Sequence, residues 1–232
     1  MHRHSFYIDG VSSRNYGIVC SGYKTMDAPQ RDVQRVSVPG RNGDLTIDNG
    51  RYLNIDVEYD AVFVYNFRQN AEAVRAWLCQ SAGYRRLEDD WNPDSYRMAR
   101  FVDGIEMEIA PLYDVAKATL RFNCMPQRWL KSGEEPVVFS AGGDLINPTL
   151  FNAQPKIVLS GNGTLTINGN TVTIADNTGE IILDSEICRA YSGTTAKDDK
   201  MTGDFPVLVP GGNAIAFTGF TSMEITPRWW TL

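Results

Sequence analysis

Histidine is nearly absent from this sequence: the only two, His2 and His4, both lie within the first four residues. A Ser-His-Asp or Cys-His arrangement needs a firmly held base, and a chain terminus is usually mobile. The G-x-S-x-G motif that presents the nucleophile of α/β hydrolases is also missing. These absences argue against nucleophilic catalysis.

Cysteine is sparse as well, and its four residues, Cys20, Cys79, Cys124 and Cys188, form no C-x-x-C pair. Without Cys/His clusters we expect no metal site, and no motif points to a cofactor. The first residues lack the apolar core of a secretory signal. We therefore expect four buried free thiols in a protein that folds in a reducing cytoplasm.

Long apolar runs and blocks of like charge are missing too. No stretch approaches the ~20 apolar residues that span a bilayer, so we expect no membrane insertion. The net charge is −6 with both signs interspersed, which argues against sequence-specific nucleic-acid binding. A composition of 43% hydrophobic and 22% charged residues is that of an ordinary folded protein.

The strongest pattern present is that of β-strands. Two segments, 53–61 and 117–124, alternate apolar and polar residues without a break. A period of two places one set of side chains on a buried face. The expected buried residues are Leu53, Ile55, Val57 and Tyr59 in the first segment, and Ala118, Leu120, Phe122 and Cys124 in the second.

Three short glycine-containing segments predict turns. Asp103-Gly104 between residues 98–102 and 105–109 favours a hairpin with a type I′ turn. Residues 168–170 (NGN) between 164–167 and 171–174 predict a second hairpin. The string Gly161-Asn162-Gly163 is followed by neither a helix nor a Gly-Lys-Ser/Thr sequence, so we interpret it as a turn and not as a phosphate loop.

One segment has helical spacing instead. Phe67, Ala71, Val74 and Leu78 fall on one face of a stretch rich in good helix formers, which predicts one amphipathic helix packed on the sheet.

The composition changes after residue 130. Residues 131–148 are rich in Gly and Pro and predict a linker with one short strand at 137–139. Beyond them small, β-prone residues predict further strands, among them 180–184 and 222–226, as in a β-sandwich. We therefore expect an N-terminal domain over 1–130, a linker over 131–148 and a C-terminal domain over 149–232.

Two groups of residues could carry chemistry. The acids Glu88, Asp89, Asp90 and Asp94 could supply the carboxylate pair of a glycosidase, but a solvated loop is the simpler interpretation. Trp129, Trp229 and Trp230 could stack on sugars, although anchoring a seam between domains is the commoner use of such residues.

Several strings in the first half resemble the distal tail protein (Dit) family of long-tailed bacteriophages. They are residues 6–11 (FYIDGV), 15–18 (NYGI), 38–45 (VPGRNGDL) and 122–126 (FNCMP). The third matches a V-P-G-R-x-G signature, and the fourth the F-x-C-x-P that closes the family's N-terminal domain.

The second half resembles the family as well. Its matching strings are 147–149 (NPT), 155–163 (PKIVLSGNG), 182–186 (ILDSE), 203–213 (GDFPVLVPGGN) and 227–230 (PRWW). The resemblance thus covers nearly the whole chain in the same order.

The resemblance implies a mainly β fold. The N-terminal domain would be a tail-tube-like β-sandwich or barrel with one flanking helix, and the C-terminal domain a galectin-like β-sandwich. It further implies a non-enzymatic structural protein at the virion tail tip, folded in the bacterial host's cytoplasm. Six copies would form a ring that joins the tail tube to the tip or baseplate hub and docks receptor-binding proteins.

Within that picture, the loop Pro39, Gly40, Arg41, Asn42 and Gly43 is the candidate subunit interface. Pro39 and Gly40 favour a tight turn and Gly43 permits positive φ, so Arg41 would be presented to a neighbour. A plain solvated hairpin tip is the alternative. For the whole chain, the alternatives are a carbohydrate-binding module or tail-associated glycosidase, and a tail-tube-type protein.

Overall fold

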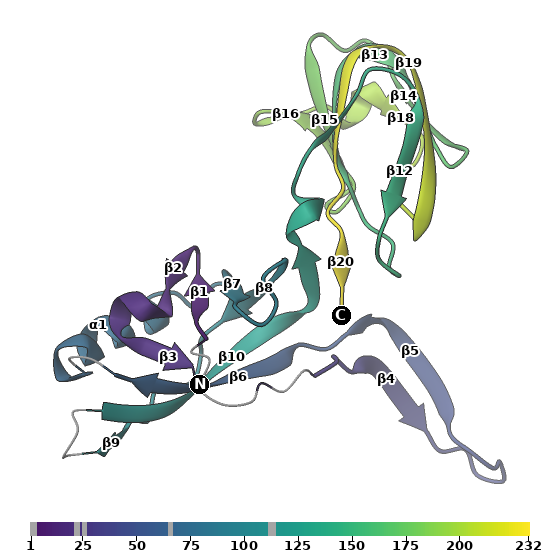
Figure 1. Cartoon of the computed structure of the whole chain (residues 1–232). Helices are drawn as coiled ribbons and strands as arrows, with labels where there is room; N and C mark the ends of the chain where they lie inside the picture. The colour runs from purple at the N-terminus through teal and green to yellow at the C-terminus, as the bar shows by residue number, and fades with distance from the viewer. Residues whose placement is uncertain (1–3, 21–23, 25–26, 65–66, 111–114) are drawn as a thin grey trace. The chain divides into compact units, whose positions relative to one another are not determined.

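The computed structural model describes residues 4–20, 24, 27–64, 67–110 and 115–232, without the side chains of 67–69 and 110. The chain divides into two compact units, Met1–Arg128 with Leu232, and Trp129–Thr231 (Figure 1). Both units consist mainly of antiparallel strands, as the sequence predicts. Among the described residues, no helix has the length and apolarity needed to cross a membrane.

The first unit is built on one antiparallel sheet with the strand order β2-β1-β7-β8-β10-β6-β3, and β9 also pairs with β10. The strands are β1 Phe6–Ile8, β2 Val11–Ser12, β3 Ile18–Cys20, β6 Ile55–Phe63, β7 Arg85–Asp89, β8 Ser95–Arg100, β9 Glu108–Ala110 and β10 Val115–Leu130. A 3₁₀ helix, η1 Ser13–Tyr16, connects β2 to β3.

The predicted helix is confirmed as α1 Phe67–Cys79. Ala71, Val74 and Leu78 are buried at the predicted spacing, and they join a core cluster with aromatic residues of the sheet such as Phe6 and Phe122. The predicted contribution of the Phe67 side chain lies outside the described residues.

Both predicted alternations form strands that pair with each other. β6 and β10 run antiparallel with Leu120 opposite Tyr59 and Phe122 opposite Val57. The four predicted residues of β10 and Tyr59 of β6 are buried. Ile55 and Val57 are only partly buried, although they pack against the core, and Leu53 precedes β6 and is 39% exposed.

The hairpin predicted at Asp103-Gly104 does not form. β8 ends at Arg100 and pairs with β7, while β9 pairs with β10. Gly104 has no positive φ, so the type I′ turn is absent. Local turn chemistry is here overridden by the longer-range pairing of the sheet.

The second unit contains one antiparallel sheet with the order β11-β19-β13-β15-β16-β17, to which β12 adds on β19, β14 on β13 and β18 on β14. The strands of this sheet are β11 Val137–Phe139, β12 Gly143–Asn147, β13 Lys156–Ile167, β14 Asn170–Ile174, β15 Glu180–Asp184, β16 Arg189–Ser192, β17 Thr195–Ala196, β18 Met201–Thr202 and β19 Gly211–Thr226. The short strand β20 Trp230–Thr231 is not part of this sheet and pairs with β10. Two 3₁₀ helices, η2 Lys131–Gly133 and η3 Asp198–Lys200, complete the second unit.

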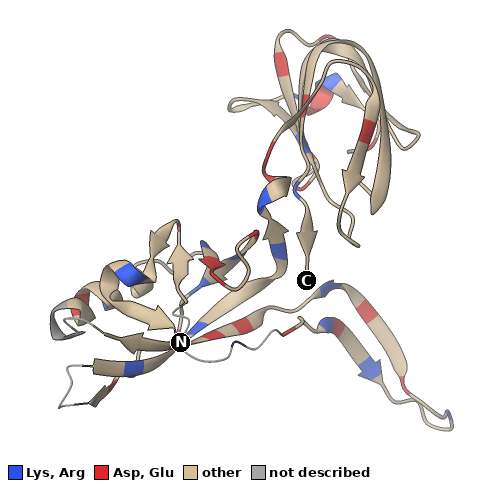
Figure 2. Cartoon of the chain, viewed as in Figure 1, with Lys and Arg blue, Asp and Glu red and all other residues tan. Residues whose placement is uncertain are grey.

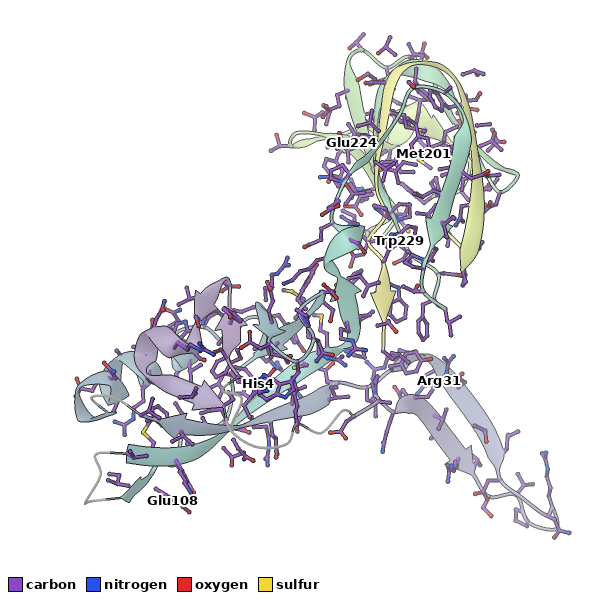
Figure 3. The ribbon with its side chains drawn as sticks, viewed as in Figure 1. His4, Arg31, Glu108, Met201, Glu224 and Trp229 are labelled. Carbon is purple, nitrogen blue, oxygen red and sulfur yellow. The ribbon has the colours of Figure 1, made fainter. Side chains whose placement is uncertain are left out.

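The long strands β13 and β19 make this sheet curl over its own core. Their pairing shifts register between Ser160 and Thr164, so Gly161 and Gly163 sit in a bulge and not in the predicted turn. A Cβ on Gly163 would clash with the carbonyl oxygen of Thr218, so only glycine permits this close approach. The curl buries apolar residues from both halves of each strand (Figure 3).

Several local predictions in this unit are confirmed. The hairpin between β13 and β14 has Asn168 and Gly169 at positive φ, as a type I′ turn requires. The short strand at 137–139 is present as β11. The segment expected as a linker, 131–148, also carries β12, and both β11 and β12 pair with β19.

The cysteines divide into two pairs of different exposure. Cys20 and Cys124 are buried free thiols, as expected, but Cys79 and Cys188 are exposed. Cys79 is the last residue of α1, and Cys188 lies in the turn before β16, so neither reaches a core.

Candidate functional site

The predicted interface loop lies at the tip of a separate two-stranded arm. β4 Arg31–Val36 and β5 Leu45–Tyr52 pair with each other in a sheet of their own (Figure 1). Their register places Gln34 opposite Ile47 and Val36 opposite Leu45. An isolated two-stranded hairpin is marginally stable in water at best, so this arm is expected to gain stability from a covering surface.

The loop at the tip has the shape that the sequence predicts. The backbone N–H of Arg41 donates to the carbonyl oxygen of Val38 over 3.1 Å, which closes a turn across Pro39 and Gly40. Gly40 and Gly43 have φ values of 79° and 83°, in the region that favours glycine. All residues from 38 to 45 are exposed, Asn42 included. Within the described residues, no hydrogen bond or ion pair engages the Arg41 side chain.

One face of the arm is apolar. Cross-strand partners share a face, so Gln34, Val36, Leu45 and Ile47 lie together. Leu45 and Ile47 are 42% and 44% exposed, which is unusual for paired β-branched or apolar strand residues. Leu45 and Ile47 alternate with polar neighbours in the sequence, which was an unused signal for this apolar face.

Charge on the arm is interspersed and self-paired (Figure 2). Arg31 pairs with Asp48 over 2.7 Å, and Arg51 pairs with Asp32 over 2.7 Å. Both pairs are solvent-exposed, and solvent screening leaves such pairs little net contribution to stability. The hydrogen bonds from Arg51 and Asn49 hold the pKa of Asp32 below its usual value.

The three predicted seam tryptophans lie in different environments, all in the second unit. Trp229 is buried in the core, and its carbonyl oxygen accepts the N–H of Leu130 over 2.9 Å. Trp230 stacks on Phe151 with ring centroids 4.4 Å apart, and its Nε1 donates to the carbonyl oxygen of Asn152. Trp129 is half-buried. A role as domain-seam anchors stays a prediction.

The acidic group is only partly the solvated loop that was expected: Asp90 and Asp94 are exposed, but Glu88 and Asp89 belong to β7. Asp89 is 9% exposed on β7 and accepts the hydroxyl of Tyr59 over 2.7 Å. It also forms an ion pair with Lys24. Asp90 accepts the backbone N–H of Ser5 over 2.7 Å. Asp89 and Asp90 are thus engaged by partners within the first unit.

His4 has defined contacts in the first unit. It forms a backbone bridge with Cys20, and its ring stacks on Trp91 with centroids 4.3 Å apart. His2 lies outside the described residues. Among the described residues, no group of three or more His, Cys, Asp or Glu could hold a metal ion.

No protein-family model matches this sequence, and no curated protein matches it. Solved structures do. The crystal structure of the SPP1 Dit protein, described as a paradigm of the hub adsorption apparatus in phages that infect Gram-positive bacteria, matches with a TM-score of 0.75 at 14% identity. The match covers 99% of each chain.

Two structures of the phage p2 baseplate in its activated conformation, with Sr and with Ca, match with a TM-score of 0.52 at 9% identity. They cover 96% and 97% of this chain and 97% and 98% of theirs. The resemblance seen in the sequence is thereby confirmed at the level of the fold: over nearly its whole length, this chain has the fold of a phage Dit protein.

Proposed function

We propose that this protein is a non-enzymatic structural subunit of a phage tail tip. The observation that carries the proposal is the separate β4–β5 arm with its exposed apolar face, in a chain that has the Dit fold throughout. An arm that cannot bury its own apolar side chains is suited to pack on another subunit.

In the assembled state, six copies form a ring that joins the tail tube to the tip or hub protein. The arm of each copy lies across its neighbour, covering the face with Val36, Leu45 and Ile47. A contact between two different patches, repeated with a closing rotation, generates a ring. Arg41 at the arm's tip then binds a carboxylate or carbonyl oxygen of that neighbour.

The second unit projects a docking surface for receptor-binding proteins. Its exposed apolar side chains include Val138, Ile146, Leu150 and Ile187, which are 60% to 88% exposed. Apolar residues at this level of exposure are typical of contact surfaces when they are grouped. The protein folds in the cytoplasm of the bacterial host and is incorporated into the virion there.

Negative-stain imaging of the purified protein, alone and with the tail-tube protein, tests the ring. Six-fold rings are expected in at least one of the two samples. Immunogold labelling of intact virions tests the location, and label confined to the distal end of the tail is expected. Label along the tail, or monomers in both imaging samples, would contradict the proposal.

A further inference from the structure

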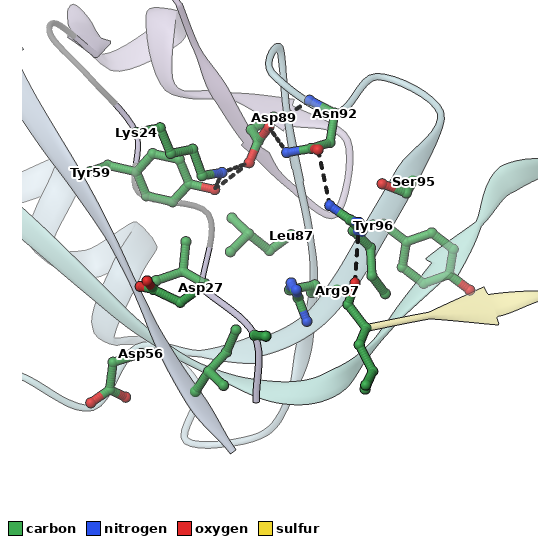
Figure 4. Close-up of a pocket in the computed structure, with 15 residues that line it drawn as sticks. Lys24, Asp27, Asp56, Tyr59, Leu87, Asp89, Asn92, Ser95, Tyr96 and Arg97 are labelled. Carbon is green, nitrogen blue, oxygen red and sulfur yellow. Dashed lines mark hydrogen bonds and ion pairs between the residues drawn. The ribbon is translucent and has the colours of Figure 1, made fainter. Parts of the chain in front are cut away.

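The first unit contains a cavity of about 210 Å³ that the structural role leaves unused (Figure 4). Strands β6 and β7 line it with Ile55, Val57 and Leu87, so part of its wall is apolar. Drug-sized ligands occupy pockets of roughly 300–1,000 Å³. This cavity therefore suits a smaller guest, about the size of one sugar ring or one amino acid.

Asp89, the buried acid of the cavity, already accepts hydrogen bonds at both of its carboxylate oxygens. Both oxygens of Asp89 are engaged: Oδ2 by Lys24 and by the Tyr59 hydroxyl, and Oδ1 by the backbone N–H groups of Trp91 and Asn92 at 3.0 and 2.9 Å. A carboxylate with this many donors has no further capacity. Asp89 therefore neutralises Lys24 and nothing else in the cavity.

Two arginines line the same cavity, and each donates to oxygen atoms of the first unit. Arg97 Nη1 donates to the carbonyl oxygen of Pro126 over 2.7 Å, and Arg128 Nη1 donates to Oδ1 of Asn92 over 3.0 Å. Arg128 Nη2 donates to a main-chain oxygen of Leu232 over 3.2 Å. Among the described residues, no Asp or Glu side chain forms an ion pair with either arginine, and donor groups remain on both guanidinium groups.

The cations also repel one another across the cavity. Burial, together with the positive charge of Arg128, lowers the pKa of Arg97. Burial lowers the pKa of Lys24 to about 8, and the charges of Arg97 and Arg128 act in the same direction. An anion bound between the guanidinium groups would relieve this repulsion.

The rim of the cavity has the opposite charge. Asp27 and Asp56 both line it and are exposed to solvent. The Asp56 side chain lies on the opposite face of β6 from Ile55 and Val57, where it accepts a hydrogen bond from Asn123 Nδ2 over 3.0 Å, so Asp27 is the rim acid available to a guest. This rim disfavours a multiply charged anion such as phosphate, and favours a guest with hydroxyl donors on its outward side.

We propose that the cavity binds a hydroxylated monocarboxylate of the size of a single sugar acid. Arg97 and Arg128 hold the carboxylate, Ile55, Val57 and Leu87 contact the carbon skeleton, and Asp27 accepts hydroxyl groups at the rim. Planar guanidinium groups suit a planar carboxylate, and hydrogen bonds between charged partners are the stronger kind. The proposal goes beyond ring assembly, because every residue that carries it lies in one unit of one chain.

The experiment is a calorimetric titration of the full chain with glucuronate, with glucose as the uncharged sugar of matched size. Saturable binding of glucuronate is expected, with glucose weaker by about tenfold or more. Arg97→Gln should weaken glucuronate binding by a similar factor. Arg75→Gln, on the exposed side of α1, serves as the matched control and should bind like the wild type.

Circular dichroism and thermal unfolding check that Arg97→Gln folds, and Arg128→Gln supplies the same test if it does not. Absence of saturable glucuronate binding by the wild type would overturn the proposal. So would equal binding of glucose, or glucuronate binding unchanged in the arginine variant that folds. Tighter binding of phosphate, or of N-acetylglutamate methylamide as a mimic of a partner's Glu side chain, would overturn the sugar-acid assignment.

Discussion

Gly133 and Trp229 lie backbone against backbone in the second unit. The carbonyl oxygen of Gly133 accepts the N–H of Arg228 over 2.8 Å, and a Cβ on residue 133 would clash with the amide nitrogen of Trp229. The same Cβ would lie 3.1 Å from the Trp229 Cα. The atoms that the added Cβ would meet are the N, Cα and Cβ of Trp229, none of which is the far end of a flexible side chain.

Gly133→Ala is therefore expected to destabilise the second unit. Overpacking of a tightly packed position typically lowers the free energy of unfolding by about 1–3 kcal/mol. Gly212→Ala is the matched control, because a Cβ there meets no atom within 4 Å. Urea unfolding monitored by tryptophan fluorescence measures both. Equal urea midpoints of unfolding for the two variants would show that the close approach of Gly133 and Trp229 does not limit stability.

The arm makes a prediction about assembly. Arg41→Ala should weaken each subunit contact by about 1–3 kcal/mol if the arginine is desolvated against a neighbour. The monomer fold should be unaffected, because the Arg41 side chain makes no polar contact within the described part of its own chain. Sedimentation velocity across a dilution series should show dissociation of the variant at concentrations where wild-type rings persist.

A second variant tests whether the apolar face of the arm, and not only its tip, contributes to the subunit contact. Ile47→Asp places a charge among the exposed side chains of β5 and should also dissociate the ring. Thr46→Asp, one residue away on the opposite face, is the matched control. If Arg41→Ala and Ile47→Asp both sediment as the wild type does, the arm does not hold subunits together.

Where periodicity is long, the sequence predicts this fold well. The alternations that become β6 and β10, the helix α1 and the hairpin between β13 and β14 are all confirmed, because each depends on residues close in the chain. The hairpin at Asp103-Gly104 and the turn at Gly161 to Gly163 fail for the opposite reason. In both places the conformation depends on pairing with a distant strand. β9 pairs with β10, and β13 pairs with β19 on both sides of a bulge.

In the candidate sites, too, the features set by neighbouring residues could be predicted, and those set by distant residues could not. The shape of the tip loop follows from Pro39, Gly40 and Gly43, which act locally. The burial of Asp89 could not be predicted, because its partners Lys24 and Tyr59 are 65 and 30 residues away in the chain. The cavity beside Asp89 joins side chains from equally distant segments, so composition and spacing gave no signal of it.

The boundary between the units can be tested with fragments. A fragment of residues 129–232 should fold and unfold cooperatively, because it retains β11 and β12, which pair with β19. A fragment of residues 149–232 begins where the sequence predicts the C-terminal domain, and it lacks both strands. It should melt at a lower temperature or fail to fold. Circular dichroism during heating compares the two, and equal melting temperatures would favour the later boundary.

The cysteines predict a two-phase labelling reaction. Burial raises the pKa of the Cys20 and Cys124 thiols to about 12, so they carry almost no thiolate at pH 8. Cys79 and Cys188 are exposed. An aromatic disulfide reagent should modify two thiols rapidly and the other two only after unfolding. Cys79→Ser combined with Cys188→Ser should abolish the rapid phase, and a rapid phase that persists would contradict the burial of Cys20 and Cys124.

The ion pair between Asp184 and Arg228 predicts how the second unit responds to acid. Nη1 and Nη2 of Arg228 donate to the two carboxylate oxygens over 2.6 and 2.9 Å, and the side chains are 8% and 22% exposed. Burial alone would raise the pKa of Asp184, but the hydrogen bonds and charge of Arg228 outweigh it and hold the pKa below its usual value.

A depressed pKa in the folded state contributes stability above the unfolded-state pKa of about 3.9, and this contribution is lost as the pH falls through the folded-state value. Arg228→Gln should therefore lower the free energy of unfolding by about 1.5–3 kcal/mol at pH 7. The difference from the wild type should shrink as the pH is lowered below about 4. Arg189→Gln breaks the exposed pair with Asp198, whose side chains are 55% and 44% exposed, and should change stability by less than about 1 kcal/mol. Urea titrations at a series of pH values measure all three proteins, and parallel pH profiles for wild type and Arg228→Gln would show that the pair does not shift the titration of Asp184.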